Sequence, residues 1–153
     1  MHALENRIPP PLVATFSGLL MGLIAVLTPG IDLPTSVRIG LSVALVALGL
    51  FFCLAGLVSF RRAKTTINPL RPARASALVS SGIYRISRNP MYVGFALFLL
   101  ALAAGLASAW SLIGVVGFML FIGRFQITPE ERALNGLFGD EYSAYQRRVR
   151  RWI

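Results

Sequence analysis

Apolar residues in this chain fall into long uncharged runs, without the two-residue or three-to-four-residue spacing of a half-buried strand or helix. Residues 11–28, 39–60 and 91–123 contain no charged side chain. Each run reaches the roughly 17 to 25 residues that an apolar helix needs to cross a bilayer. We therefore predict an all-α fold, a polytopic bundle of membrane-spanning helices.

The third run is too long for one crossing. As a single helix its 33 residues would measure roughly 50 Å, against a hydrocarbon core of about 30 Å. We expect a bend over residues 105–111, where small residues accompany Trp110, because an indole favours the membrane interface. The sequence thus predicts four spans, at about residues 11–28, 39–60, 91–106 and 110–125.

Small side chains recur along the last two predicted spans. They are Gly94, Ala101, Gly105, Gly114 and Gly117. Residues of this size let helix backbones approach closely in a membrane. We therefore expect these two spans to be short and tightly paired with each other.

Basic residues set the predicted orientation. The net charge is +9, with seven Lys or Arg residues in 61–88 and six in 124–151, whereas the connection 29–38 holds only Asp32 and Arg38. The positive-inside rule therefore predicts that both termini and the loop 61–90 are cytoplasmic. Because topology already accounts for the charge, we predict no nucleic-acid partner. The Ala- and Arg-rich composition and the compact four-span plan favour a bacterial inner membrane.

The whole chain, residues 1–153, is predicted to form one integral-membrane domain, with a polar lead at 1–10 and C-terminal helices over 128–152. Thr128 followed by Pro129 is typical of a helix start, and Glu131 would complete a capping box with Thr128.

The first of these C-terminal helices should end near Gly136 or Gly139, with a second helix over 141–149. We interpret Tyr142 and Tyr145 as packing or interfacial residues. The basic cluster 147–151 is interpreted as a contact with anionic lipid.

The run GIYRISRNPMYVG, residues 82–94, is the strongest candidate for a site. Arg88, Asn89 and Pro90 offer charge, amide donors and a fixed bend at the mouth of a predicted span. Five of the six acidic residues are predicted at the same membrane face. The only histidine is His2, so histidine acid–base catalysis and the usual His or Cys metal sites are not expected.

Group transfer from an activated cofactor suits such a site, because the cofactor supplies most of the chemistry. Methyl transfer from a sulfonium requires the protein to align donor and acceptor, exclude water and anchor an amino acid, a ribose and an adenine. A carboxylate such as Glu130 would suit the ammonium group, and Arg88 or backbone amides would suit the carboxylate.

Two motifs and the apolar pair between them carry a family resemblance. LVSSGIYRISRNPMYVG, two short spans and EERALNGLFGDEYSAYQRRV resemble the C-terminal core of the isoprenylcysteine carboxyl methyltransferase and phospholipid methyltransferase superfamily, over about residues 60–152. The resemblance implies S-adenosylmethionine as donor, held between the loop 61–90, the last two spans and the C-terminal helices. It also implies a lipid-side tunnel for a lipophilic small-molecule acceptor, with membrane lipids as surroundings.

The resemblance also implies roles for individual residues. The implied donor-binding residues are Ser76, Leu78, Val79, Tyr84, Asn89, Pro90, Tyr92 and Glu130. Asn89 stands where the carboxyl methyltransferases carry histidine, and its amide cannot accept a proton as an imidazole can. Arg88 and Glu131 are the predicted catalytic residues, with Glu131 completing an acidic pair typical of the phospholipid-directed members. The acceptor's deprotonation is open between a tyrosine, Glu131 and water.

One departure from the family bears on the acceptor. The prenylcysteine enzymes carry an arginine four residues before the first glutamate, where this chain has Gln126, and Arg124 lies about 200° away around a helix. We predict that Gln126 and Arg124 contact the acceptor. A lipid amine, thiol or hydroxyl is favoured over a prenylcysteine-like carboxylate.

Two other functions are compatible with the sequence. Some sterol reductases share a comparable C-terminal arrangement, so an NADPH-dependent membrane reductase is one alternative. A non-enzymatic lipid-binding membrane protein is the other. The oligomeric state is not determined by the sequence.

Overall fold

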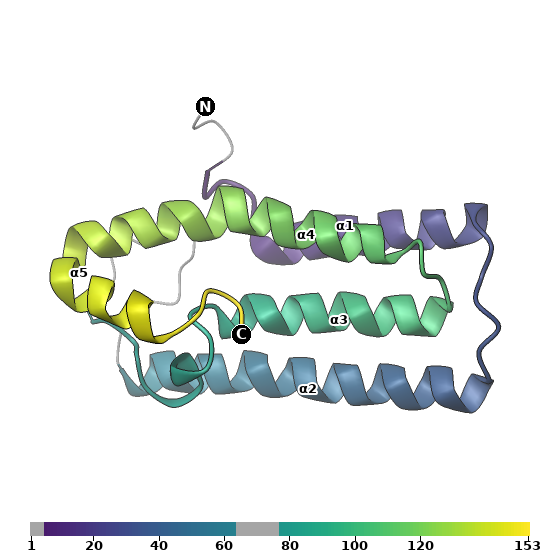
Figure 1. The fold of residues 1–153 in the computed structure, drawn as a ribbon, viewed down its shortest axis with the longest axis horizontal. Coiled ribbons are helices and arrows are strands. Elements are labelled where there is room, and N and C mark those ends of the chain that lie inside the picture. The colour runs from purple at the N-terminus through teal and green to yellow at the C-terminus, as the bar shows by residue number, and fades with distance from the viewer. Residues whose placement is uncertain (1–4, 64–76) are drawn as a thin grey trace.

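The computed structural model describes residues 5–63 and 77–153 and contains helices and no strands in these residues (Figure 1). The α-helices are α1 (Pro10–Leu27), α2 (Thr35–Arg62), α3 (Pro90–Leu106), α4 (Leu112–Ile122) and α5 (Thr128–Arg148). A 3₁₀ turn, η2, covers Gly82–Arg85, and a π-helical turn, η3, covers Gly123–Ile127. The all-α prediction is confirmed.

Successive helices α1 to α4 run in alternating directions, and α4 continues through η3 into α5 (Figure 1). α1, α2 and the helical run from Leu112 to Arg148, which is interrupted at Gly139, are long and apolar enough to cross a membrane. α3 is a shorter apolar helix of 17 residues. The end of α2, the start of α3 and α5 lie at one end of the bundle (Figure 1). The prediction of a membrane helix bundle is confirmed.

The central position of α3 explains its pattern of burial. Large apolar side chains on α1, α2 and α4 are widely exposed, as Leu19, Leu54 and Leu120 illustrate. On α3, Leu102 is the only described large hydrophobic residue in the exposed class. Exposed apolar faces of this extent are expected where helices meet lipid.

Glycines bring α3 against α2. A Cβ atom on Gly94 would lie 2.8 Å from the carbonyl oxygen of Gly49, and one on Gly49 would lie 2.6 Å from the Phe98 ring. The hydroxyl of Ser42 on α2 also donates to the carbonyl oxygen of Ala101, at 3.0 Å. The close approach that small residues predict therefore occurs between α2 and α3.

The small residues of α4 pack against α1. A Cβ atom on Gly114 would lie 3.0 Å from Met21 Sδ on α1, and the Ser111 hydroxyl donates to the Met21 carbonyl oxygen at 2.9 Å. The last two spans share an apolar cluster that includes Leu99 and Phe118, but the closest approaches of Gly94 and Gly114 are to earlier helices. Each packs closely on an earlier helix, because those helices present the complementary surfaces.

The predicted N-cap at Thr128 is wrong, because helical backbone runs through this residue. Thr128 and the residue before it have helical backbone angles, and the Thr128 hydroxyl donates to the Gly123 carbonyl oxygen at 2.8 Å. Pro129 has no N–H to offer the Phe125 carbonyl oxygen four residues earlier. That oxygen instead accepts the backbone N–H of Asn6, at 3.1 Å. The π-helical turn thus takes the place of a cap.

Gly139 reverses the chain within α5. Its φ of 49° and ψ of −120° interrupt the helix in the left-handed region that favours glycine. The returning part brings Tyr142, Tyr145 and Val149 into an apolar cluster with η2 and the start of α3. The predicted break near Gly139 and the packing interpretation of both tyrosines are confirmed.

Candidate functional site

The first group of polar residues joins α3 to α5. Tyr92, in the first turn of α3, donates its hydroxyl to Glu130 Oε1 at 2.6 Å, and Gln126 Nε2 donates to the same oxygen at 2.6 Å. Tyr92 is 7% exposed and Gln126 2% exposed. The π-helical turn ends at Ile127, so Gln126 and Glu130 face each other across its junction with α5. The two sequence motifs therefore meet.

Glu130 lies beyond the uncharged run that ends at Gly123. Burial is the largest cause that raises the pKa of its carboxyl group to about 7, and the nearby charge of Glu131 acts in the same direction. The hydrogen bonds from Tyr92 and Gln126 lower this pKa but do not cancel the effect of burial. A buried carboxyl group of this kind is suited to a cationic ligand, which would restore its charged form.

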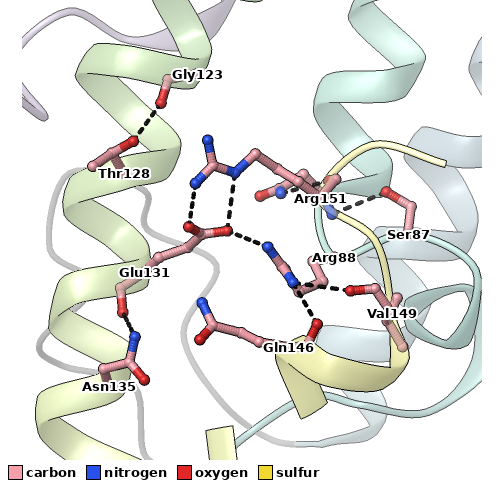
Figure 2. Close-up of polar contacts among 10 residues, drawn as sticks. Ser87, Arg88, Gly123, Thr128, Glu131, Asn135, Gln146, Val149 and Arg151 are labelled. Atoms are coloured by element: carbon pink, nitrogen blue, oxygen red, sulfur yellow. Dashed lines mark hydrogen bonds and ion pairs between the residues drawn. The ribbon is translucent and has the colours of Figure 1, made fainter. Parts of the chain in front are cut away.

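The second group is an ion-pair cluster on Glu131, shown in Figure 2. Arg88 Nη2 lies 2.7 Å from Glu131 Oε1. Arg151 approaches the same carboxylate with two nitrogens, Nη2 at 2.6 Å from Oε2 and Nε at 3.2 Å from Oε1. The Arg88 and Glu131 side chains are each 12% exposed. Both oxygens of Glu131 thus accept from guanidinium groups.

Other donors of the Arg-Asn-Pro turn bind the C-terminal segment. Arg88 Nη1 donates to the carbonyl oxygens of Gln146, at 3.0 Å, and Val149, at 2.9 Å. The side-chain amide of Asn89 donates to the Arg151 carbonyl oxygen at 2.8 Å. Arg88 and Asn89 therefore hold residues 146–151 against the start of α3.

The other predicted donor-binding residues lie beside these two groups. Leu78, Val79 and Tyr84 belong to the apolar cluster under the second half of α5, and Pro90 is a buried first residue of α3. The Tyr145 hydroxyl donates to the Tyr84 carbonyl oxygen at 2.7 Å. Burial raises the pKa of the Tyr84 phenol, so it remains protonated at neutral pH. Ser76 lies outside the described residues.

The structure does not bring the two predicted acceptor-binding residues together. Gln126 is buried, whereas the Arg124 side chain is 52% exposed. Arg124 lies over the Phe125 ring, 5.7 Å from its centroid, and 3.6 Å from Glu5 Oε1. Arg124 is thus directed toward the N-terminal lead.

Sequence reasoning does not identify Arg151 as part of this cluster. The interpretation of residues 147–151 as a lipid contact does not account for Arg151, which binds Glu131. No local pattern around residues 147–151 distinguishes Arg151 from the arginines beside it.

The chain is similar to known proteins over much of its length. A profile of the phospholipid methyltransferase family matches residues 37–141. A protein-S-isoprenylcysteine O-methyltransferase of Schizosaccharomyces pombe is 37% identical over 75 residues, 47% of this chain and 30% of that protein. Protein-S-isoprenylcysteine O-methyltransferase B of Arabidopsis thaliana is 28% identical over 108 residues, 69% of this chain and 53% of that protein.

An uncharacterized protein of Haemophilus influenzae is 44% identical over 63 residues, which are 41% of this chain and all of that protein. No solved structure matches. The chain spans about half or less of the length of the two named methyltransferases. The family match itself includes Tyr92, Gln126, Glu130 and Glu131. The resemblance first noted in the two motifs is confirmed, and the chain belongs to the phospholipid methyltransferase family.

Proposed function

We propose that this protein transfers a methyl group from S-adenosylmethionine to a lipophilic acceptor at the cytoplasmic face of a bacterial inner membrane, with both termini in the cytoplasm. The observation that carries the proposal is the buried contact of Tyr92 and Gln126 with Glu130 in a chain of this family. This contact joins the two motifs through Tyr92 and Glu130, which are 38 residues apart in the chain.

The residues present fit the donor. Both hydrogen bonds to Glu130 fall on Oε1, so Oε2 is left to accept from an ammonium group. Arg88 Nε is buried and has no hydrogen-bond partner in the described structure, so one cationic donor is left for a carboxylate. S-adenosylmethionine supplies an activated methyl group on a sulfonium when bound. The chain's own task is to anchor, orient and exclude water.

An open apolar groove between α1 and α3 suits the acceptor. Its volume is about 360 Å³. It is lined by Pro11, Ala14, Thr15, Gly18, Phe95, Phe98, Leu99 and Leu102. Phe95 lies one helical turn after Tyr92, so an apolar chain in the groove would bring its polar end toward the site. The neutral side chain of Gln126 favours an amine, thiol or hydroxyl there.

The surroundings of the candidate bases favour water for deprotonation of the acceptor. Burial raises the pKa of the phenols of Tyr84 and Tyr142, so neither is a phenolate at neutral pH. Both oxygens of Glu131 are occupied by arginines. A nucleophile that is already neutral, or that loses its proton to solvent, therefore suits this site best. Arg88 and Glu131 then act by ordering the site.

The proposal is tested by titrating the full chain in detergent with S-adenosylmethionine and S-adenosylhomocysteine, using calorimetry. We expect Glu130→Gln to weaken donor binding by about tenfold to a hundredfold, because a hydrogen bond to a charged group contributes about 1.5–3 kcal/mol. Glu141→Gln, on the exposed surface of α5, serves as the matched control.

A radiolabelled methyl assay on extracted membrane lipids then identifies the acceptor class. If the protein bound NADPH but neither S-adenosylmethionine nor S-adenosylhomocysteine, a reductase activity would be indicated in place of methyl transfer. Unchanged affinities for every ligand in Glu130→Gln and Tyr92→Ala would indicate a non-enzymatic lipid-binding protein.

A further inference from the structure

The last residues of the chain make contacts that a simple lipid anchor would not require. Residues 147, 148 and 150 are exposed arginines, whereas Arg151 is partly buried and binds Glu131 through two nitrogens (Figure 2). A side-on guanidinium contact of this kind fixes both partners, because two parallel hydrogen bonds define one geometry. Arg151 lies outside the family match, which ends at residue 141.

The backbone of the same segment is also bound. The chain leaves helix α5 at Val149, whose φ of −124° and ψ of 133° are extended. An extended segment cannot satisfy its own carbonyl groups. The oxygens of Val149, Arg150 and Arg151 instead accept from Arg88 Nη1, the Arg88 backbone N–H and Asn89 Nδ2, at 2.9, 3.0 and 2.8 Å.

The side chain that follows secures the segment on its apolar side. Trp152 packs against both apolar clusters, the one that contains Tyr92 and the one that contains Tyr142. Polar and apolar contacts therefore hold residues 149–152, which we call the C-terminal clasp, in one position.

The clasp connects the two elements that build the proposed donor site. Through Arg88 and Asn89 it holds the turn that opens α3, and Tyr92 lies in the first turn of that helix. Through Arg151 it holds Glu131, the neighbour of Glu130 on α5. The hydrogen bond between Tyr92 and Glu130 thus joins two elements that the clasp fixes relative to each other.

We infer that Arg151 is a positioning residue for the donor site, acting through Glu131 so that Glu130 and Tyr92 face one ligand. The inference rests on the proposed function, since the ligand it concerns is S-adenosylmethionine. The C-terminal clasp would thus contribute to donor affinity, whether or not the exposed arginines at 147, 148 and 150 contact lipid.

The test compares Arg151→Gln with Arg148→Gln, which removes the same charge from an exposed position on the last turn of α5. Binding of S-adenosylhomocysteine is measured by calorimetry on the full chain in detergent, and unfolding by a thermal scan of the unliganded protein. We expect Arg151→Gln to weaken binding by about tenfold, the size of a coupling between contacting residues. Arg148→Gln should bind as the wild type does.

Rescue separates positioning from general stability. Arg151→Lys keeps the charge but cannot make the two-nitrogen contact, so binding should fall between the wild type and Arg151→Gln. If Arg151→Gln lowers the melting temperature, its loss of affinity does not distinguish positioning from stability, and the affinity of Arg151→Lys is used instead. Wild-type affinity in Arg151→Lys overturns the inference. Equal affinity of Arg151→Gln and Arg148→Gln overturns it as well. A wild-type protein that binds no S-adenosylhomocysteine would instead overturn the proposed function.

Discussion

Glu130 and Glu131 are adjacent in the chain, and their surroundings give them different chemistry. Glu131 is bound by two guanidinium groups. Glu130 receives the neutral donors of Tyr92 and Gln126 in the described part of the chain, and its burial raises the pKa of the carboxyl group to about 7. At neutral pH, Glu131 is therefore a fixed partner of the arginines, whereas Glu130 has no cationic partner among the described residues.

Replacement of Glu130 should make the unliganded protein more stable while it weakens donor binding. A carboxyl group whose pKa is raised on folding holds a proton more tightly in the folded state, so its contribution to stability is lost as the pH rises toward 7. At pH 8 we expect Glu130→Gln to raise the free energy of unfolding by about 1 to 3 kcal/mol. Thermal scans in detergent measure the difference.

The gain in unfolding free energy of Glu130→Gln should vanish near pH 4.5. At this pH the wild-type carboxyl group is protonated in the folded state and half protonated in the unfolded state. A gain of the same size at pH 4.5 and pH 8 would contradict the pKa argument, because it would reflect packing alone. Wild-type donor affinity should fall as the pH drops below about 7, since protonation removes the charge that an ammonium group would meet.

At the scale of elements, the π-helical turn sets how Gln126 meets Glu130. Pro129 cannot donate to the Phe125 carbonyl oxygen, and this oxygen accepts the Asn6 N–H. The N-terminal lead is held there by Glu5, whose Oε1 lies 2.9 Å from Arg132 Nη2 on α5. One proline thus couples the lead to the residues that build the candidate site. Turns of this kind occur frequently at functional sites.

Pro129→Ala should therefore affect binding more than stability. The new N–H would compete with Asn6 for the Phe125 oxygen and favour a regular α-helix, which would rotate Gln126 relative to Glu130. We expect donor affinity to fall by about tenfold with little change in melting temperature, because alanine is a good helix former.

Gly136→Ala provides the control, since none of the described residues has an atom within 4 Å of a Cβ there and the change raises helix propensity away from the π turn. Equal donor affinity of Pro129→Ala and Gly136→Ala would show that the π turn is not needed for binding.

For the whole molecule, what could be predicted from the sequence depended on whether the signal was local. Uncharged runs and the Arg-Asn-Pro turn are local, so the membrane bundle and the position of the 88–92 turn followed from composition. The contact of Arg151 with Glu131 depends on the reversal at Gly139 and the extended backbone at Val149, and no local pattern encodes their combined direction. Thr128 carried a local signature of a helix start, but the continuing α4 prevailed over it.

The pairing of helices shows the same limit. The glycines on α3 and α4 predicted close helix contacts but not the partner helices. Gly94 packs on α2, and Gly114 packs on α1. Any helix surface of matching shape can receive a glycine, so the partner depends on the path of the whole chain. This path also leaves the open groove between α1 and α3, whose lining comes from two segments about 80 residues apart in the chain.

If an apolar acceptor reaches the site through this groove, filling it should affect the acceptor and leave the donor unaffected. Gly18 lines the groove, whereas Gly22, one turn further along α1, is not among the lining residues, and a Cβ atom there would have no atom within 4 Å. In the methyl-transfer assay, we expect Gly18→Leu to raise the acceptor KM by about tenfold, because it occupies space that an acyl or prenyl chain would bury. Donor affinity should stay at the wild-type value, and Gly22→Leu should change neither quantity. An unchanged acceptor KM in Gly18→Leu would move the acceptor route to another face of the bundle, whereas a matching loss of donor affinity would indicate that the substitution displaces α3 and, with it, Tyr92.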